Sequence, residues 1–150
     1  MTEKTLAALL SALLLSLPAR LEAQGGFGPK DLGLIVLGQG GGEECKKISH
    51  TLEKSLGREI PVEVIAGLPG TSDLLRSLEK MKTARVKKIA VVALYLRSDD
   101  PELEQARYLL GIAQYPSEGI MKGAHSHMGS ARIKRALTKI PLSMTQALDD

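Results

Sequence analysis

The most constraining feature of the sequence is an apolar run in the middle of the chain. Residues 89–96 read IAVVALYL, and the hydroxyl group of Tyr95 is the one polar side-chain group among them. An uninterrupted run of this kind is typical of a strand that is buried on both faces, as at the centre of a parallel sheet. Since such a strand needs helices on both sides, the segment from Val86 to Leu96 predicts an α/β fold.

Three further segments have the character of strands. Leu32–Leu37 is a short apolar run that ends at Gly38, Val62–Ala66 is rich in β-branched residues, and a last strand is expected near Thr138–Met144. Strands of this length that alternate with helices predict right-handed crossovers. We therefore expect a doubly wound, mostly parallel sheet of about four strands.

The segments between the expected strands have helical periodicity. In each, the apolar residues recur three and four positions apart, which is one face of a helix. The first helix is expected at Glu43–Leu56, the second is expected to be capped by Thr71 or Ser72, and the third opens at Asp100 and Pro101 with the aspartate as its cap. The expected inner faces are Cys45, Ile48, Leu52 and Leu56; then Leu74, Leu75, Leu78 and Met81; then Leu103, Ala106, Leu109 and Leu110.

The first 23 residues have the pattern of a secretory signal peptide. Lys4 precedes an apolar run from Leu6 to Leu17, Pro18 follows it, and Ala23 offers a small residue for cleavage. The alternative is an amphipathic first helix, although the run has no polar face. The pattern predicts an exported protein, periplasmic or secreted, with a flexible segment at residues 24–31 and one domain at residues 32–150. It also predicts that the mature protein makes no contact with the membrane.

The composition of the chain limits which partners and which cysteine chemistry we expect. The formal net charge of +3 and four aromatic residues without tryptophan argue against nucleic acid as a partner, so the basic residues between 80 and 88 are interpreted as a solvated helix end. The single cysteine, Cys45, excludes an intramolecular disulfide framework and leaves a buried thiol or a reactive thiolate as alternatives. The chain ends at Asp150, where a further helix is expected, which predicts either a longer protein or a partner that covers this face.

A glycine-rich loop follows the first expected strand and leads into a helix. It reads Gly38-Gln39-Gly40-Gly41-Gly42, and ligands of open parallel sheets bind beyond the carboxyl ends of the strands. Glycines permit close approach of a ligand, and a helix N-terminus favours an anion. The loop matches neither the dinucleotide fingerprint nor the P-loop, and the acidic pair that follows it opposes a phosphate. A tight turn is therefore the simpler interpretation.

Several segments together resemble one family. They are LIVLG at 34–38 with its loop at 39–41, PVEV at 61–64, residues 72–80, the strand at 86–96 and IPL at 140–142. The arrangement resembles the CbiX-type sirohydrochlorin chelatases, class II enzymes of cobalamin biosynthesis that insert cobalt, iron or nickel into tetrapyrroles. The resemblance covers about residues 32–150. It implies a chelatase-like fold, a divalent metal ion as substrate without an organic cofactor, a tetrapyrrole ligand, and a second chelatase-like half or a homodimer.

The chain departs from this family at the residues that carry its chemistry. The family's first loop contains Gly-His-Gly, whereas Gln39 stands at the histidine position, and the loop after the third strand also lacks the family's second histidine. An amide has no useful pKa and is a weak metal ligand. The resemblance therefore implies substrate-binding residues but no assigned catalytic residue: Gly38, Gln39, Gly40, Gly41, Arg97 and Ser98. The alternative function is a non-catalytic periplasmic module that binds metal or tetrapyrrole, or that pairs with another half.

Histidines elsewhere are the remaining candidates for metal binding. His125 and His127 could reach one ion from a loop, or belong to a solvated loop, and a complete site needs further ligands. If the protein inserts metal, one of these two would have to act as the base. His50 lies in the first expected helix and is interpreted as a surface residue.

Overall fold

The computed structural model describes residues 28–40, 43–56, 59–116 and 134–147. These residues form four strands, three α-helices and a short 3-10 turn, in the alternating order that the sequence predicts. The elements are η1 (Pro29–Asp31), β1 (Leu32–Gly38), α2 (Glu43–Leu56), β2 (Val62–Ala66), α3 (Thr71–Thr83), β3 (Lys88–Leu94), α4 (Pro101–Leu109) and β4 (Leu142–Met144).

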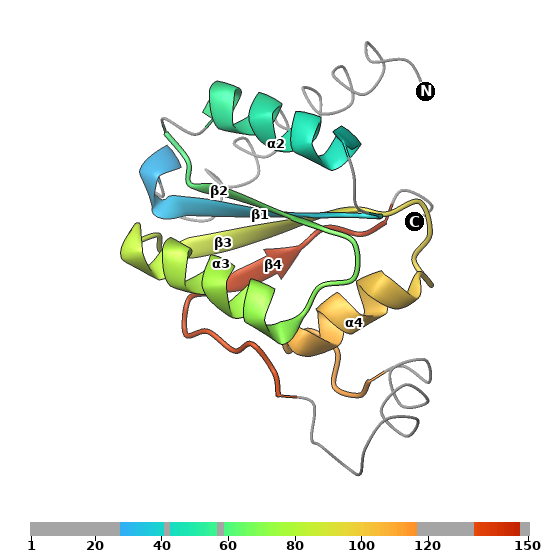
Figure 1. Cartoon of the computed structure of the whole chain (residues 1–150). Coiled ribbons are helices and arrows are strands. Elements are labelled where there is room, and N and C mark those ends of the chain that lie inside the picture. Colours follow the sequence, from blue (N-terminus) through green and yellow to red (C-terminus); the bar gives the residue numbers. More distant parts are fainter. Residues whose placement is uncertain (1–27, 41–42, 57–58, 117–133, 148–150) are drawn as a thin grey trace.

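The strands form one parallel sheet in the order β2-β1-β3-β4. Helix α2 covers one face, and helices α3 and α4 cover the other (Figure 1). The chain runs outward from β1 to β2, then returns past β1 to β3 and continues to β4. This doubly wound arrangement confirms the expected fold class, and it places the topological switch point between β1 and β3.

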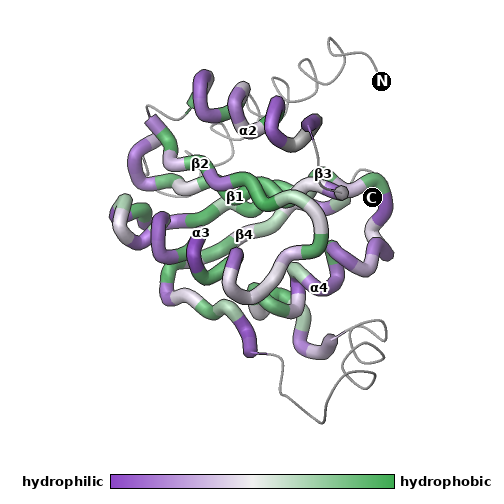
Figure 2. Tube along the Cα trace, viewed as in Figure 1, coloured by the Kyte–Doolittle hydropathy of each residue, from purple (hydrophilic) through white to green (hydrophobic). Residues whose placement is uncertain are grey.

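Each face of the sheet has its own apolar core. Figure 2 shows that the hydrophobic strands lie between helices whose residues are largely hydrophilic. Alternate residues of β1 and β3 point to opposite faces, as the period of a strand requires. The α2 face contains Leu34, Val36, Leu52, Ala90 and Val92. The α3 and α4 face contains Ile35, Leu37, Leu74, Leu78, Met81, Ile89, Val91, Tyr95, Leu103, Ala106 and Leu109 among others.

The start of α3 differs from the expectation. Gly70 is the N-cap, and no side chain caps the helix. Thr71 is the first helical residue, and its hydroxyl donates a hydrogen bond of 2.9 Å to the carbonyl oxygen of Lys134. The predicted caps, Thr71 and Ser72, are therefore wrong because the helix begins one residue earlier than they require. Leu75, expected on the inner face, is 41% exposed.

The start of α4 agrees with the expectation. Oδ1 of Asp100 accepts a hydrogen bond of 2.8 Å from the backbone nitrogen of Glu102, and Pro101 occupies the first helical position. All four apolar residues expected on the inner face of this helix are buried.

The last strand is shorter than expected, because only residues 142–144 pair with β3. Thr145 continues the contact in another way. Its backbone nitrogen donates to the carbonyl oxygen of Val91, and its hydroxyl oxygen accepts a hydrogen bond of 3.0 Å from the backbone nitrogen of Ala93. Among the described residues, no helix has the length and apolar character that crossing a membrane requires. The expected signal peptide and the side chain of Cys45 lie outside what the structure describes.

Candidate functional site

The candidate site lies at the carboxyl edge of the sheet, where β1 and β3 end side by side. Gly38 pairs with Leu94 in the register of these two strands. The loop after β2 joins the same edge, since the backbone nitrogen of Gly67 donates a hydrogen bond of 2.9 Å to the carbonyl oxygen of Gly38. Gly40 has a φ of 72°, which glycine adopts without strain, so the chain can turn sharply away from the sheet. The loops after three adjacent strands therefore meet at the switch point.

One side-chain hydrogen bond joins the loops that follow β1 and β3. Nε2 of Gln39 donates to Oδ2 of Asp100 over 2.9 Å, while the other oxygen of the same carboxylate caps α4. This Gln39–Asp100 bridge spans the switch point and fixes the orientation of the Gln39 amide. Gln39 thus acts as a hydrogen-bond donor at the switch point, and its neutral amide cannot serve as a base.

The predicted residues of the β3 loop lie at the same edge. The guanidinium group of Arg97 holds both carboxylate oxygens of Asp99, at 2.8 and 2.6 Å. These hydrogen bonds from Arg97 lower the pKa of Asp99, so the carboxylate stays ionised at neutral pH. The carbonyl oxygen of Ser98 accepts a hydrogen bond of 3.2 Å from Nη1 of Arg107. The structure therefore brings Gly38, Gln39 and Gly40 to the same edge as Arg97 and Ser98, whereas Gly41 lies outside the described residues.

Two exposed leucines lie at this edge. From the sequence alone, they were not identified together as candidate binding residues. Leu68 follows β2 and is 59% exposed, and Leu96 follows β3 and is 62% exposed. Each extends an apolar sequence beyond the end of its strand, so the signal is a large apolar residue between a buried strand and a helix start. The loops of Leu68 and Leu96 lie on either side of the loop that follows β1, so both side chains lie at the carboxyl edge, where they can contact an apolar ligand.

The described residues offer no ready metal centre. No group of three or more histidine, cysteine, aspartate or glutamate side chains among them could hold an ion. His50 lies on α2 and is exposed, as expected. His125 and His127 lie outside the described residues, so the predicted metal ligands stay a prediction. The carboxylate of Asp100 already accepts hydrogen bonds from its helix and from Gln39.

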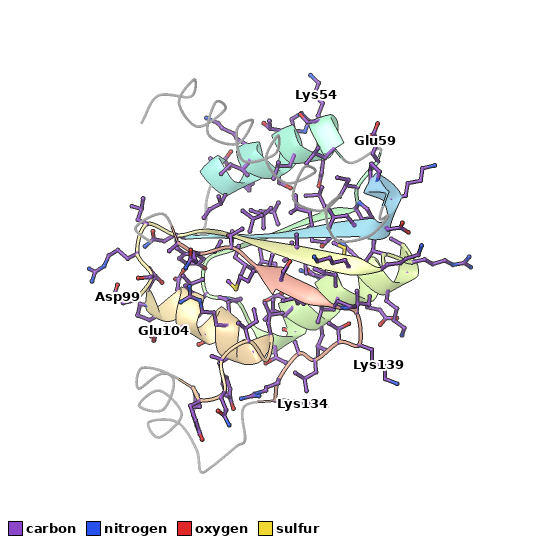
Figure 3. The ribbon with its side chains drawn as sticks, turned by 180° about the vertical axis from the view of Figure 1, so that it is seen from behind. Lys54, Glu59, Asp99, Glu104, Lys134 and Lys139 are labelled. Carbon is purple, nitrogen blue, oxygen red and sulfur yellow. The ribbon has the colours of Figure 1, made fainter. Side chains whose placement is uncertain are left out.

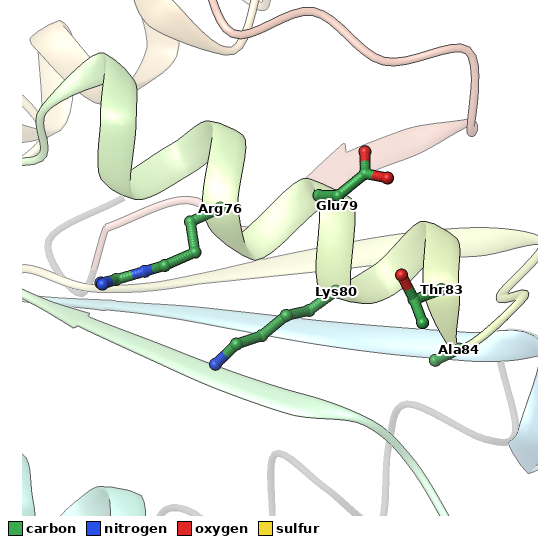
Figure 4. A pocket seen from close by; sticks show the side chains of 5 residues that line it. All are labelled: Arg76, Glu79, Lys80, Thr83 and Ala84. Carbon is green, nitrogen blue, oxygen red and sulfur yellow. The ribbon is translucent and has the colours of Figure 1, made fainter.

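A hollow elsewhere on the surface is not part of the site. It has a volume of about 540 Å³ and is lined by Arg76, Glu79, Lys80, Thr83 and Ala84, all of helix α3 or its C-terminal end (Figure 4). Three of these residues are already in ion pairs, since Lys80 contacts Glu63 at 2.7 Å, Arg76 contacts Asp73 at 3.5 Å and Glu79 contacts Lys82 at 3.2 Å. The hollow lies along the outer side of one helix rather than at the strand ends, where open parallel sheets bind ligands.

No protein-family model matches the chain, and no curated protein or solved structure is significantly similar to it.

Proposed function

We propose that the protein is an exported, chelatase-like protein that binds a tetrapyrrole at the carboxyl edge of its sheet. The metal ion of this macrocycle would be divalent cobalt, iron or nickel. The observation that carries this proposal is the pair of exposed leucines, Leu68 and Leu96, in the loops that follow β2 and β3 at the carboxyl edge of the sheet. A tetrapyrrole is flat and largely apolar, and its carboxylate substituents can accept hydrogen bonds from a guanidinium group such as that of Arg97.

The Gln39–Asp100 bridge favours a protein that binds the tetrapyrrole without inserting the metal ion. Insertion requires a base that removes pyrrole protons and ligands that release the ion. Gln39 cannot act as a base, and the Asp100 carboxylate already accepts two hydrogen bonds. A catalytic role therefore depends on His125 or His127, and the alternative is a non-catalytic module that binds the macrocycle or pairs with a second chelatase-like half.

The binding test compares leucines of similar exposure in different places. Leu96→Asp is set against Leu137→Asp, because Leu137 is 65% exposed and lies in the segment that leads to β4. Burial of a leucine side chain contributes about 1.5–3 kcal/mol, so removal of a partly buried contact should weaken binding about tenfold. Titration with metal-free sirohydrochlorin, followed by absorbance, should show this loss for Leu96→Asp and less than about a twofold change for Leu137→Asp.

Two results would contradict the proposed binding. One is the absence of any spectral change with the wild-type chain, and the other is an equal loss for both leucine variants. Insertion is measured separately, by the absorption change when cobalt is added to the bound macrocycle. Turnover that is lost in a His125→Ala and His127→Ala double variant would support catalysis, and binding without turnover would support the non-catalytic module.

A further inference from the structure

The opposite end of the molecule carries a group of exposed cations. Strands start at the amino edge of a parallel sheet, and the helices that connect them end there. In Figure 3, Lys54 and Lys139 lie at this end, whereas Asp99 and Glu104 lie at the carboxyl end. We define the amino-edge cationic surface by the residues at these strand starts and helix ends: Lys30, Lys54, Arg85, Lys88 and Lys139.

These five cations have little local compensation. None of them forms an ion pair with another described residue. Four of the five are exposed, and Lys88 is partly buried. Glu53, in the last turn of α2, and Glu59 (Figure 3) are exposed acids at this end, whereas Asp31 is held by Lys87 at 2.9 Å. The surface therefore has a clear excess of positive charge.

Helix dipoles account for only part of this excess. Cations near the C-terminus of a helix are stabilised by its dipole, which applies to Lys54 in the last turn of α2 and to Arg85 after α3. Lys30, Lys88 and Lys139 instead precede or open strands, where no helix end explains them. The surface thus carries more positive charge than the helix dipoles account for.

Arg85 is held in a backbone conformation that costs energy. Its φ is 59°, and it is the one non-glycine residue with positive φ among those that the structure describes. The backbone nitrogens of Arg85 and Val86 donate to the carbonyl oxygens of Lys82 and Met81, which closes the end of α3 in the manner for which glycine is preferred. An exposed arginine at a position that suits glycine indicates that its side chain has a use outside the fold.

We propose that the amino-edge cationic surface binds the anionic headgroups of a phospholipid membrane. The surface spans the starts of three strands and the ends of two helices, so its cations can face one extended anionic partner. Four of its five cations are lysines, and lysine is depleted at protein–protein interfaces but is effective at anionic lipid surfaces. No described aromatic side chain belongs to it that could stack on bases. The proposal replaces the expectation that the mature protein makes no membrane contact, and it is independent of the tetrapyrrole site.

The test measures binding of the full chain to phosphatidylcholine vesicles with and without about 30% phosphatidylglycerol, by co-sedimentation at about 50 and 500 mM salt. The side-chain charges of residues 1–23 cancel, and the patch and control variants share this segment, so a difference between the two variants reports on the substituted residues. The patch variant combines Lys54→Gln, Arg85→Gly and Lys139→Gln. Each basic residue contributes about fivefold to partitioning, so this variant should lose on the order of 100-fold of the salt-sensitive binding.

The control removes the same net charge elsewhere, with Lys46→Gln, Lys47→Gln and Arg76→Gln, and should change binding less than about fivefold. Arg85→Gly alone should lower binding and yet raise the melting temperature, since glycine relieves the backbone conformation; this combination separates loss of the surface from loss of the fold. Equal losses for patch and control variants, no salt-sensitive binding to the anionic vesicles, or tighter binding to duplex DNA than to these vesicles would each overturn the proposal.

Discussion

Replacement of Asp100 by alanine tests the two hydrogen bonds that connect the loops of the candidate site. The carboxylate accepts one hydrogen bond from the start of α4 and another from Gln39, at 2.8 and 2.9 Å. Loss of an N-cap costs about 1 kcal/mol, and an exposed hydrogen bond to a charged group contributes about 0.5–1 kcal/mol. Asp100→Ala should therefore lower the free energy of unfolding by about 1.5–2 kcal/mol, which lowers the melting temperature by about 6–8 °C.

The matched variants separate the two hydrogen bonds. Gln39→Ala should cost about 0.5–1 kcal/mol, because it removes only the bridge. Asp100→Asn should cost less than about 0.5 kcal/mol, since the amide oxygen of asparagine can keep the cap while its Nδ2 donates to Oε1 of Gln39 after the Gln39 amide turns over. Urea unfolding of wild type, both alanine variants and their double variant, followed by circular dichroism, gives the coupling energy.

A coupling energy of about 0.5–1 kcal/mol between the two alanine substitutions is the expected result. Additive effects would refute the bridge, because residues that do not interact lose stability independently. A cost below about 0.5 kcal/mol for Asp100→Ala would also refute the capping role.

Three further predictions concern the fold. Gly33→Ala should destabilise the protein by about 1–3 kcal/mol in urea unfolding, because an added Cβ would overlap Sδ of Met81; a neutral result would contradict this packing. Leu103→Ala should cost about 2–5 kcal/mol by the same assay, since this side chain is fully buried, and a cost below 1 kcal/mol would contradict the position of α4. A hydrogen bond from Lys87 lowers the pKa of Asp31 below 3.8, so this pair stabilises the fold above that pH and its contribution is lost as the pH falls through the lowered pKa. Asp31→Asn should therefore be less stable than wild type at pH 7, and the difference should shrink as the pH falls below 3.8; an undiminished difference in acid would exclude the pair as the cause.

The strands and helix faces could be predicted because their signals are local. The strand predicted at 86–96 contains β3, and the three-and-four spacing of apolar residues located α2 at its observed bounds, Glu43–Leu56. Asp100 followed by Pro101 identified the start of α4 because a capping side chain and the fixed φ of proline act on adjacent residues. The alternation of strands and helices was then sufficient to predict the parallel, doubly wound sheet.

Details set by contacts between distant segments could not be predicted in the same way. Thr71 suits a helix cap by residue type, yet its hydroxyl donates to the carbonyl oxygen of Lys134, which is distant in sequence. Leu75 fits the inner face by spacing but lies at its margin, where the core does not cover it. The Gln39–Asp100 bridge joins residues 61 positions apart, and only the pairing of β1 with β3 brings them together.

The position of the ligand is the most direct test of the proposed function. Amide chemical shifts in a nitrogen–proton correlation spectrum of the isotopically labelled chain would be followed during titration with metal-free sirohydrochlorin. The proposal predicts that the largest shifts occur at the carboxyl edge, at Gln39, Gly40, Leu68 and Leu96. Shifts confined to the outer side of α3 or to the amino edge, or no shifts at saturating ligand, would contradict it.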